Sequence, residues 1–127
     1  MFFDTHAHLT DKQFKDDFDG VIRSIKAANV TLVLNPGSSL SNSYRSAELS
    51  EELDFVYAGV GVHPHSVKDL TEDGIDELYA LSKKEKVMAI GEIGLDYFYD
   101  YSPREIQKAW FRRQLELARE VNLPAII

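Results

Sequence analysis

The four histidines of this chain occur as two pairs, and in each pair a single residue separates the two imidazoles. His6 and His8 follow the apolar start of the chain, whereas His63 and His65 close a second apolar run. Side chains two residues apart on a strand project from the same face, so the imidazoles of one pair can bind a single metal ion. The alternative is a polar strand end with two solvated histidines. The repeated spacing favours the metal site.

A carboxylate interrupts a third apolar run, residues 87–97, which carries Glu92 in its middle. An ionised carboxylate is costly to bury unless a cation or hydrogen bonds compensate it. We therefore expect His6, His8 and Glu92 to be metal ligands. Asp4 lies one step back on the face that carries His6, and we expect it to hold a ring N–H behind the ligands.

Apolar spacing predicts strands that alternate with amphipathic helices. Strands are expected over residues 1–8, 31–35, 55–65 and 87–97, with another beginning at 123. Helices are expected over residues 10–29, 44–53, 71–86 and 102–121, and capping boxes are expected at Thr10 with Gln13 and at Ser102 with Glu105. This alternation implies right-handed crossovers and a parallel sheet covered by helices.

Two architectures have such a sheet. A doubly wound sheet usually carries a glycine-rich phosphate loop after its first strand, where this chain has His6 and His8. In a (β/α)8 barrel, active-site groups come from the C-terminal ends of several strands, as the histidines and approximately Glu92 do. We therefore predict an α/β fold of the (β/α)8 TIM type. A complete barrel needs about 250 residues, so residues 1–127 are expected to form a single domain, the N-terminal half, with four βα units and the start of strand five.

Composition excludes several classes of protein. The chain has 127 residues, of which 44% are hydrophobic and 28% are charged, as in ordinary globular domains. Its formal net charge of −7 argues against nucleic-acid binding through a basic stripe alone. There is no cysteine, which removes disulfides and thiolate ligands. No apolar run approaches the length of a membrane span and no basic leader precedes one, so we expect a cytoplasmic protein.

At its motifs the sequence resembles the TatD family of metal-dependent deoxyribonucleases, a branch of the amidohydrolase-like (β/α)8 hydrolases. The resemblance covers the whole chain but only the N-terminal half of the family's length. The matching motifs are residues 3–8, 61–65, 91–97, 114–118 and 123–124.

The resemblance implies a role for each matched residue. His6 and His8 would bind one metal ion, and Glu92 would bind it and bridge to a second. Glu92 and His63 would be the catalytic groups, with His63 near the substrate and His65 behind the ligands or at the substrate. The cofactors would be one or two divalent ions, Zn, Mg or Mn. The family's further ligands lie past Ile127, so residues 1–127 alone are expected to be inactive.

A loop rich in aromatic residues follows the run that contains Glu92. Asp96 and Tyr97 open this loop and are expected to lie behind the ligands or to contact substrate. Tyr97, Phe98, Tyr99 and Tyr101 could stack on unpaired bases or could pack the loop on the barrel rim.

Three functions are compatible with these residues. The first is metal-assisted hydrolysis of phosphodiester bonds, as an exonuclease on single-stranded DNA. The second is amide or lactone hydrolysis on the same barrel, although such enzymes often carry a carboxylated lysine on the fourth strand, where this chain has Glu92. The third is a non-catalytic half-barrel that self-associates, because open sheet edges and inward faces, including Phe2, Leu32, Leu34 and Val62 or their neighbours, would be uncovered.

Overall fold

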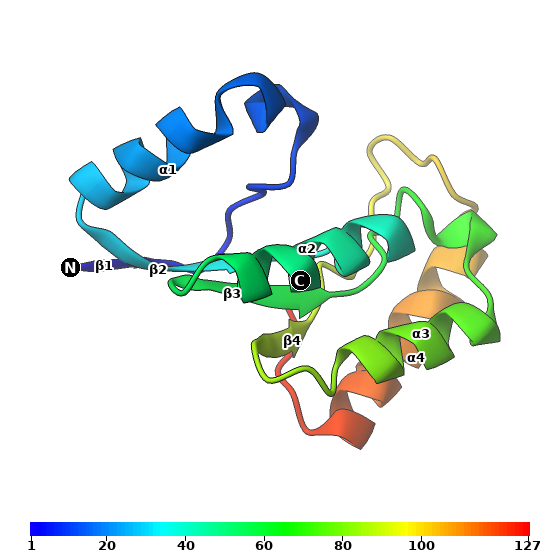
Figure 1. Cartoon of the computed structure of the whole chain (residues 1–127). Helices are drawn as coiled ribbons and strands as arrows, with labels where there is room; N and C mark the ends of the chain where they lie inside the picture. Colours follow the sequence, from blue (N-terminus) through cyan, green and yellow to red (C-terminus); the bar gives the residue numbers. More distant parts are fainter.

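The computed structural model describes residues 1–127 as four βα units (Figure 1). The strands are β1 (Phe2–Asp4), β2 (Val30–Asn35), β3 (Val56–Val60) and β4 (Val87–Ile90). The α-helices are α1 (Phe18–Ala27), α2 (Leu40–Glu52), α3 (Glu72–Leu81) and α4 (Arg104–Val121), and two short 3-10 helices are η1 (Lys12–Asp17) and η2 (Val67–Asp69).

All strand pairs are parallel, and the strands lie in the order β1-β2-β3-β4. In a doubly wound sheet the order of the strands reverses, so that later strands lie on the other side of the first strand. Strands that follow chain order are instead the arrangement of a (β/α)8 barrel. The predicted fold class, the N-terminal half of such a barrel, is confirmed.

The chain after α4 begins a fifth strand beside β4, as predicted. Ala125 forms a parallel bridge with Ile90. The N–H of Ile90 donates to the carbonyl of Pro124 (2.9 Å), and the N–H of Ile126 donates to the carbonyl of Ile90 (2.9 Å). This short ladder covers the edge of β4.

Helix starts agree with the sequence in part. Thr71, just before the predicted helix, caps α3, because its hydroxyl accepts the N–H of Gly74. The first helical segment is instead capped by Asp11, whose carboxylate accepts the N–H of Gln13 (2.9 Å). The predicted cap, Thr10, turns its hydroxyl toward α2.

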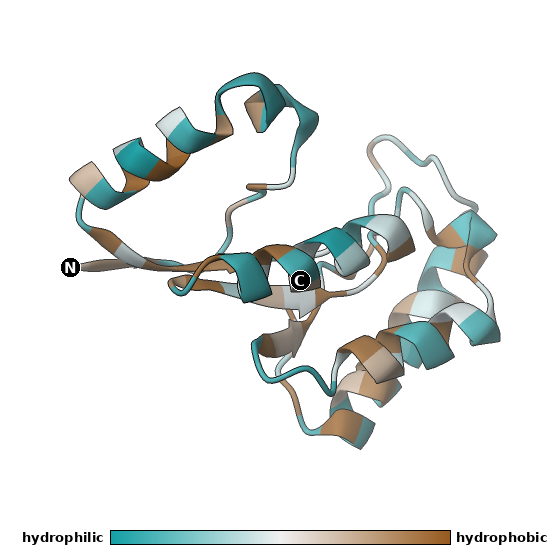
Figure 2. Ribbon diagram, viewed as in Figure 1, coloured by the Kyte–Doolittle hydropathy of each residue, from teal (hydrophilic) through white to brown (hydrophobic).

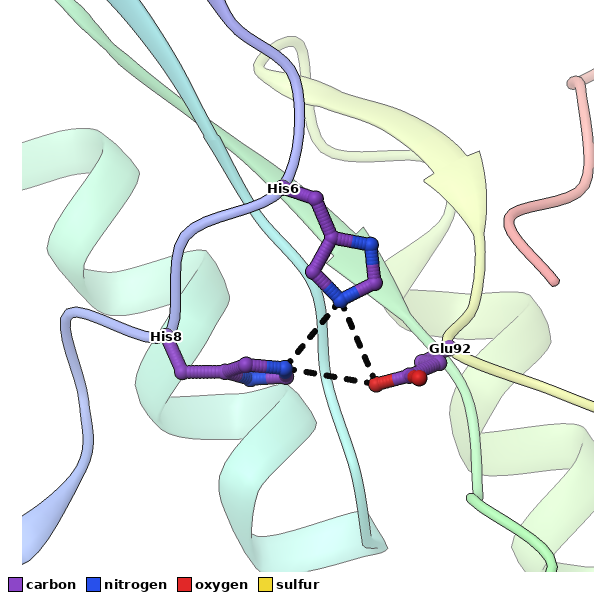
Figure 3. Close-up of side chains that lie close together, drawn as sticks. All are labelled: His6, His8 and Glu92. Carbon is purple, nitrogen blue, oxygen red and sulfur yellow. Dashed lines mark hydrogen bonds and ion pairs between the residues drawn. The ribbon is translucent and has the colours of Figure 1, made fainter. Parts of the chain in front are cut away.

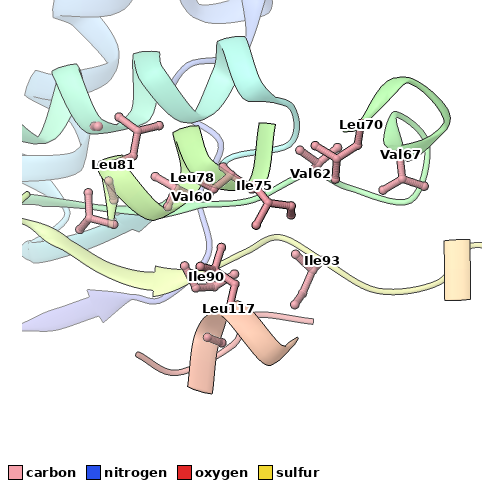
Figure 4. Packing of buried hydrophobic residues seen from close by; sticks show 14 residues of the cluster. Val60, Val62, Val67, Leu70, Ile75, Leu78, Leu81, Ile90, Ile93 and Leu117 are labelled. Atoms are coloured by element: carbon pink, nitrogen blue, oxygen red, sulfur yellow. The ribbon is translucent and has the colours of Figure 1, made fainter. Parts of the chain in front are cut away.

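Two apolar clusters form the core. The larger lies between β3, β4, α3 and α4 and includes Val60, Ile75, Ile90 and Leu117 (Figure 4). The smaller joins β2, β3 and α2, and α1 packs against it. Figure 2 shows the hydrophobic side of α1 turned toward the sheet.

The opposite face of the sheet is open and apolar. It forms a hollow of about 650 Å³ whose lining includes Leu32 and Leu34. Leu32 is exposed, as predicted for an inward-facing position, and in β1 the residue on this face is Phe3, the neighbour of the predicted Phe2. The prediction for Val62 is wrong: this side chain is buried in the larger cluster on the helix-covered face.

The apolar spacing of residues 102–121 predicts a buried stripe of Ile106, Ala109, Trp110, Leu117 and Val121, and the structure agrees in part. Leu117 is buried, and Trp110 and Val121 pack against the larger cluster, but Ile106 and Ala109 are exposed. The other buried residues of α4 are Gln107, Gln114 and Ala118. No helix in the structure combines the length and the apolar character that a membrane crossing requires.

Gln114 clamps the chain after β3. Its side-chain oxygen accepts the N–H of Val62 (2.8 Å), and its side-chain N–H donates to the carbonyl of Val62 (3.0 Å). Both backbone groups of the residue that precedes His63 are thus satisfied by one buried amide. Gln107 lies two turns earlier on the same face of α4 and binds the loop after β4 in the same way.

We expect Gln114→Ala to lower the free energy of unfolding by about 2 kcal/mol, because a buried N–H and a buried carbonyl lose their partner. Chemical unfolding followed by circular dichroism measures the change. Glu116→Ala, an exposed substitution on the same helix, is the matched control and should stay within about 0.5 kcal/mol of the parent. Equal stability of the two variants would mean that the clamp contributes nothing.

Candidate metal centre

Backbone hydrogen bonds fix the loops after all four strands at the carboxyl edge of the sheet. The N–H of Ala7, which lies between the first two histidines, donates to the carbonyl of Leu34 (3.1 Å). The N–H of Glu92 donates to the carbonyl of Gly37 (2.7 Å), and the N–H of His63 donates to the carbonyl of Ser38 (3.0 Å). The chemically active side chains are therefore held by fixed backbone.

The structure brings the three predicted metal ligands together (Figure 3). The Nε2 atoms of His6 and His8 lie 3.1 Å apart. Oε2 of Glu92 lies 3.4 Å from Nε2 of His6 and 3.3 Å from Nε2 of His8. One donor atom from each residue thus forms a nearly equilateral triangle.

The size of this triangle suits a divalent ion. In a tetrahedral zinc site with bonds of about 2.0–2.1 Å, neighbouring donor atoms lie about 3.3 Å apart. In an octahedral magnesium site with similar bond lengths the separation is about 2.9 Å. The observed 3.1–3.4 Å is closer to the tetrahedral value. Two imidazoles and a carboxylate are also ordinary ligands for zinc and related ions.

The prediction that His6 and His8 project from one face of a strand is wrong. Strand β1 ends at Asp4, so both histidines lie in the following loop and not on one strand face. Asp4 also does not hold a ring N–H. Its carboxylate accepts the backbone N–H of His6 (3.1 Å), a local turn that ends the strand. Strand β4 ends at Ile90, so Glu92 also lies in the loop that follows the strand and not in its middle.

His63 faces the second oxygen of Glu92, with Nε2 3.9 Å from Oε1. The Nδ1 atom of His63 accepts the backbone N–H of His65 (3.2 Å), so the proton of the neutral ring is on Nε2. Burial lowers the pKa of His63, against the opposing effect of the Glu92 carboxylate. His63 is thus a neutral ring that points an N–H into the site.

His65 and Asp96 form a separate pair, in which the His65 ring nitrogen binds the Asp96 carboxylate. This hydrogen bond is the main cause of the lowered pKa of Asp96, and the backbone N–H of Tyr99 adds to it. The ring of His65 also contacts that of His63, with centroids 4.2 Å apart. Tyr97 lies apart from these groups, under the guanidinium of Arg104 (4.6 Å).

A polar pocket of about 280 Å³ adjoins the ligand triangle. Its lining residues are His8, Thr10, Asp11, Ser38, Asn42, His63, His65 and Glu92. The sequence analysis did not identify Asn42, which donates from its side chain to the hydroxyl of Thr10 (2.9 Å) and accepts the N–H of Ser38 (3.1 Å). In the sequence, the only sign of this side of the pocket is the serine-rich segment 38–43 at the start of α2.

Comparison with known proteins places the chain in a family. The sequence model of the family described as TatD related DNase matches residues 3–127. The metal-dependent hydrolase YabD of Bacillus subtilis is 48% identical over 127 residues, which are 100% of this chain and 50% of that protein. The 3'-5' ssDNA/RNA exonuclease TatD of Pantoea ananatis is 36% identical over 126 residues, which are 98% of this chain and 48% of that protein.

Solved structures agree with the sequence relatives. The TatD homologue YJJV of Escherichia coli K12 superimposes with a TM-score of 0.89 at 31% identity, over 98% of this chain and 49% of that one. An amidohydrolase of Saccharomyces cerevisiae gives 0.82 at 27% identity, over 92% of this chain and 43% of that one. The chain thus spans about half the length of the relatives that it matches. The match of the family model over almost every residue shows that the chain belongs to the TatD-related DNase family.

Proposed function

We propose that the chain is part of a metal-dependent hydrolase that cleaves phosphodiester bonds in single-stranded nucleic acid, as an exonuclease. The observation that carries the proposal is the triangle of His6, His8 and Glu92 beside a polar pocket. Relatives named as a metal-dependent hydrolase and as a 3'-5' ssDNA/RNA exonuclease support the reaction and the substrate class.

Each residue of the site has a task in this reaction. His6 and His8 offer Nε2, and Glu92 offers Oε2, to one divalent ion, of which zinc, manganese and magnesium are the candidates. When bound there, such an ion would lower the pKa of a water ligand to about 7 and would offset charge on a phosphoryl oxygen. Oε1 of Glu92 lies on the side of His63, 3.9 Å from its Nε2, and would be the oxygen available to a second ion.

His63 serves as a hydrogen-bond donor to the substrate. Its Nε2–H points into the polar pocket, and burial keeps the ring neutral. A neutral donor at this position can bind a non-bridging phosphate oxygen without adding a second cation beside the metal ligands. His65 holds His63 in this tautomer through its backbone N–H.

Residues 1–127 offer three donor atoms, fewer than a complete metal site has. Three donor atoms leave at least one ligand position of a tetrahedral ion open, and a second ion would have only Glu92. The resemblance implies further ligands beyond Ile127. Activity is therefore best measured in an extended protein, in which residues 1–127 are followed by the second half of the Bacillus subtilis relative.

Amide or lactone hydrolysis is the second candidate, because an amidohydrolase of Saccharomyces cerevisiae shares the fold. The same metal site would then activate water for attack on a carbonyl carbon. Assay of the extended protein on single-stranded DNA and on amide and lactone substrates separates the two reactions.

The first prediction concerns metal binding by residues 1–127. Replacing His6 and His8 together by alanine should weaken zinc binding at least about tenfold, because two of three donor atoms are lost. Isothermal titration and elemental analysis measure this. Glu85→Gln, which removes an exposed carboxylate elsewhere, is the control. Unchanged metal content in the double variant would disprove the assignment.

The second prediction concerns Glu92. In the extended protein, Glu92→Gln should reduce turnover of a single-stranded oligonucleotide at least about a hundredfold, because the amide keeps the shape but loses the charge that binds metal. Thermal unfolding should be nearly unchanged. Near-normal turnover would identify Glu92 as a structural carboxylate.

The third prediction compares two lengths of chain. Residues 1–127 alone should show no appreciable cleavage of single-stranded DNA with manganese, magnesium or zinc, whereas the extended protein should cleave it. The exposed apolar face of the sheet should also make the short chain self-associate, as measured by light scattering on the same sample. A monomeric short chain as active as the extended protein would contradict both expectations.

A further inference from the structure

The loop that follows β4 exposes an unusual amount of aromatic surface. Tyr97, Phe98, Tyr99 and Tyr101 are 40%, 87%, 56% and 58% exposed. Contiguous exposed apolar surface of this kind usually marks a binding site.

The loop is nevertheless held rigidly. The carboxylate of Asp96 accepts the backbone N–H groups of Phe98 (2.9 Å) and Tyr99 (3.0 Å). The buried side chain of Gln107 binds both backbone groups of Asp96, at 2.8 and 3.0 Å, and donates to the carbonyl of Ser102 (2.8 Å). Ser102, predicted to cap α4, instead donates its hydroxyl to the carbonyl of His65 (3.3 Å). A fixed backbone lowers the entropy that the rings lose on binding.

Three of the exposed rings contact one another in a row, and we name them the aromatic platform: Phe98, Tyr99 and Tyr101. The rings of Tyr99 and Tyr101 are stacked, with centroids 5.3 Å apart and an interplanar angle of 21°. Phe98 packs edge-on against Tyr99 at 4.8 Å. Tyr97 is not part of the platform, because the guanidinium of Arg104 covers its ring.

His65 connects the platform to the polar pocket. Its ring lies 4.9 Å from that of Tyr101 and 5.6 Å from that of Tyr99. On its other side it lies 4.2 Å from the ring of His63, which lines the pocket. A group bound on the platform is therefore one imidazole away from a group bound in the pocket.

We propose that the aromatic platform binds an unpaired nucleobase by stacking, while the adjacent phosphate occupies the polar pocket. This inference rests on the proposed function and adds to it a site for the base. A base pair inside a duplex offers no free face, so the platform selects single strands.

Equilibrium binding of residues 1–127 to two fluorescent oligonucleotides of equal length, one of thymidine and one abasic, tests the platform. The phosphates are the same, so the ratio of the two Kd values reports the bases alone. Zinc can be present in this measurement, because residues 1–127 alone are expected not to cleave, and the parent should bind the thymidine oligonucleotide about tenfold more tightly. The double variant Phe98→Ala with Tyr99→Ala should bind both equally.

Two further variants make the result specific. Tyr79→Ala removes a tyrosine of similar exposure on α3 and should keep the tenfold ratio. Phe98→Leu keeps apolar bulk but removes the π face, so it should reduce the ratio even if the double variant unfolds. A parent ratio near one, or a ratio that survives Phe98→Leu and the double variant, overturns the proposal.

Cleavage by the extended protein separates this inference from the proposed function. Cleavage of both oligonucleotides with no preference for bases would leave the hydrolase standing and remove the platform. A base-dependent Kd ratio without cleavage of either oligonucleotide would support the platform and remove the phosphodiesterase.

Discussion

The parallel hydrogen-bond ladder from β1 to β4 is the constraint on which the site depends, because it sends every following loop to the same edge of the sheet. The loops approach closely there. A Cβ atom added at Gly61 would lie 2.9 Å from both Cα and N of Gly91, so only glycine fits at this crossing. This approach of the chains after β3 and β4 brings His63 beside Glu92.

Helix α4 stabilises the same edge from the outside. Its two buried glutamines bind the backbone of Val62 and of Asp96, one in each loop. A buried amide is favourable only when its polar atoms are paired, and the structure contains no unpaired buried side-chain nitrogen or oxygen. Loops that carry chemistry are thus positioned by a polar layer between helix and sheet, while the apolar clusters supply most of the burial.

Much of the fold could be predicted because its signals are local. The histidine pairs follow apolar runs, and Glu92 lies within another. Parallel topology then brings the carboxyl ends of these runs to one edge of the sheet. The details depended on contacts between distant segments. Asp4 ends β1 by binding the backbone of His6, and Gln114 is buried because Val62, far away in sequence, needs a partner. Neither contact leaves a pattern in the spacing of residues, so β1 was predicted too long and the buried face of α4 was predicted to be apolar.

The order of the strands also has a consequence for how the protein is made. Each strand pairs with the one synthesised just before it, so pairing can proceed on the ribosome without waiting for distant sequence. Val56 is the last buried member of the smaller core cluster along the chain, so this cluster can form before β4 is synthesised. His6 and His8 emerge early, but Glu92 joins them only after β4 has been added. The nascent chain therefore acquires the third of its proposed metal donors late, when most of the sheet is already in place.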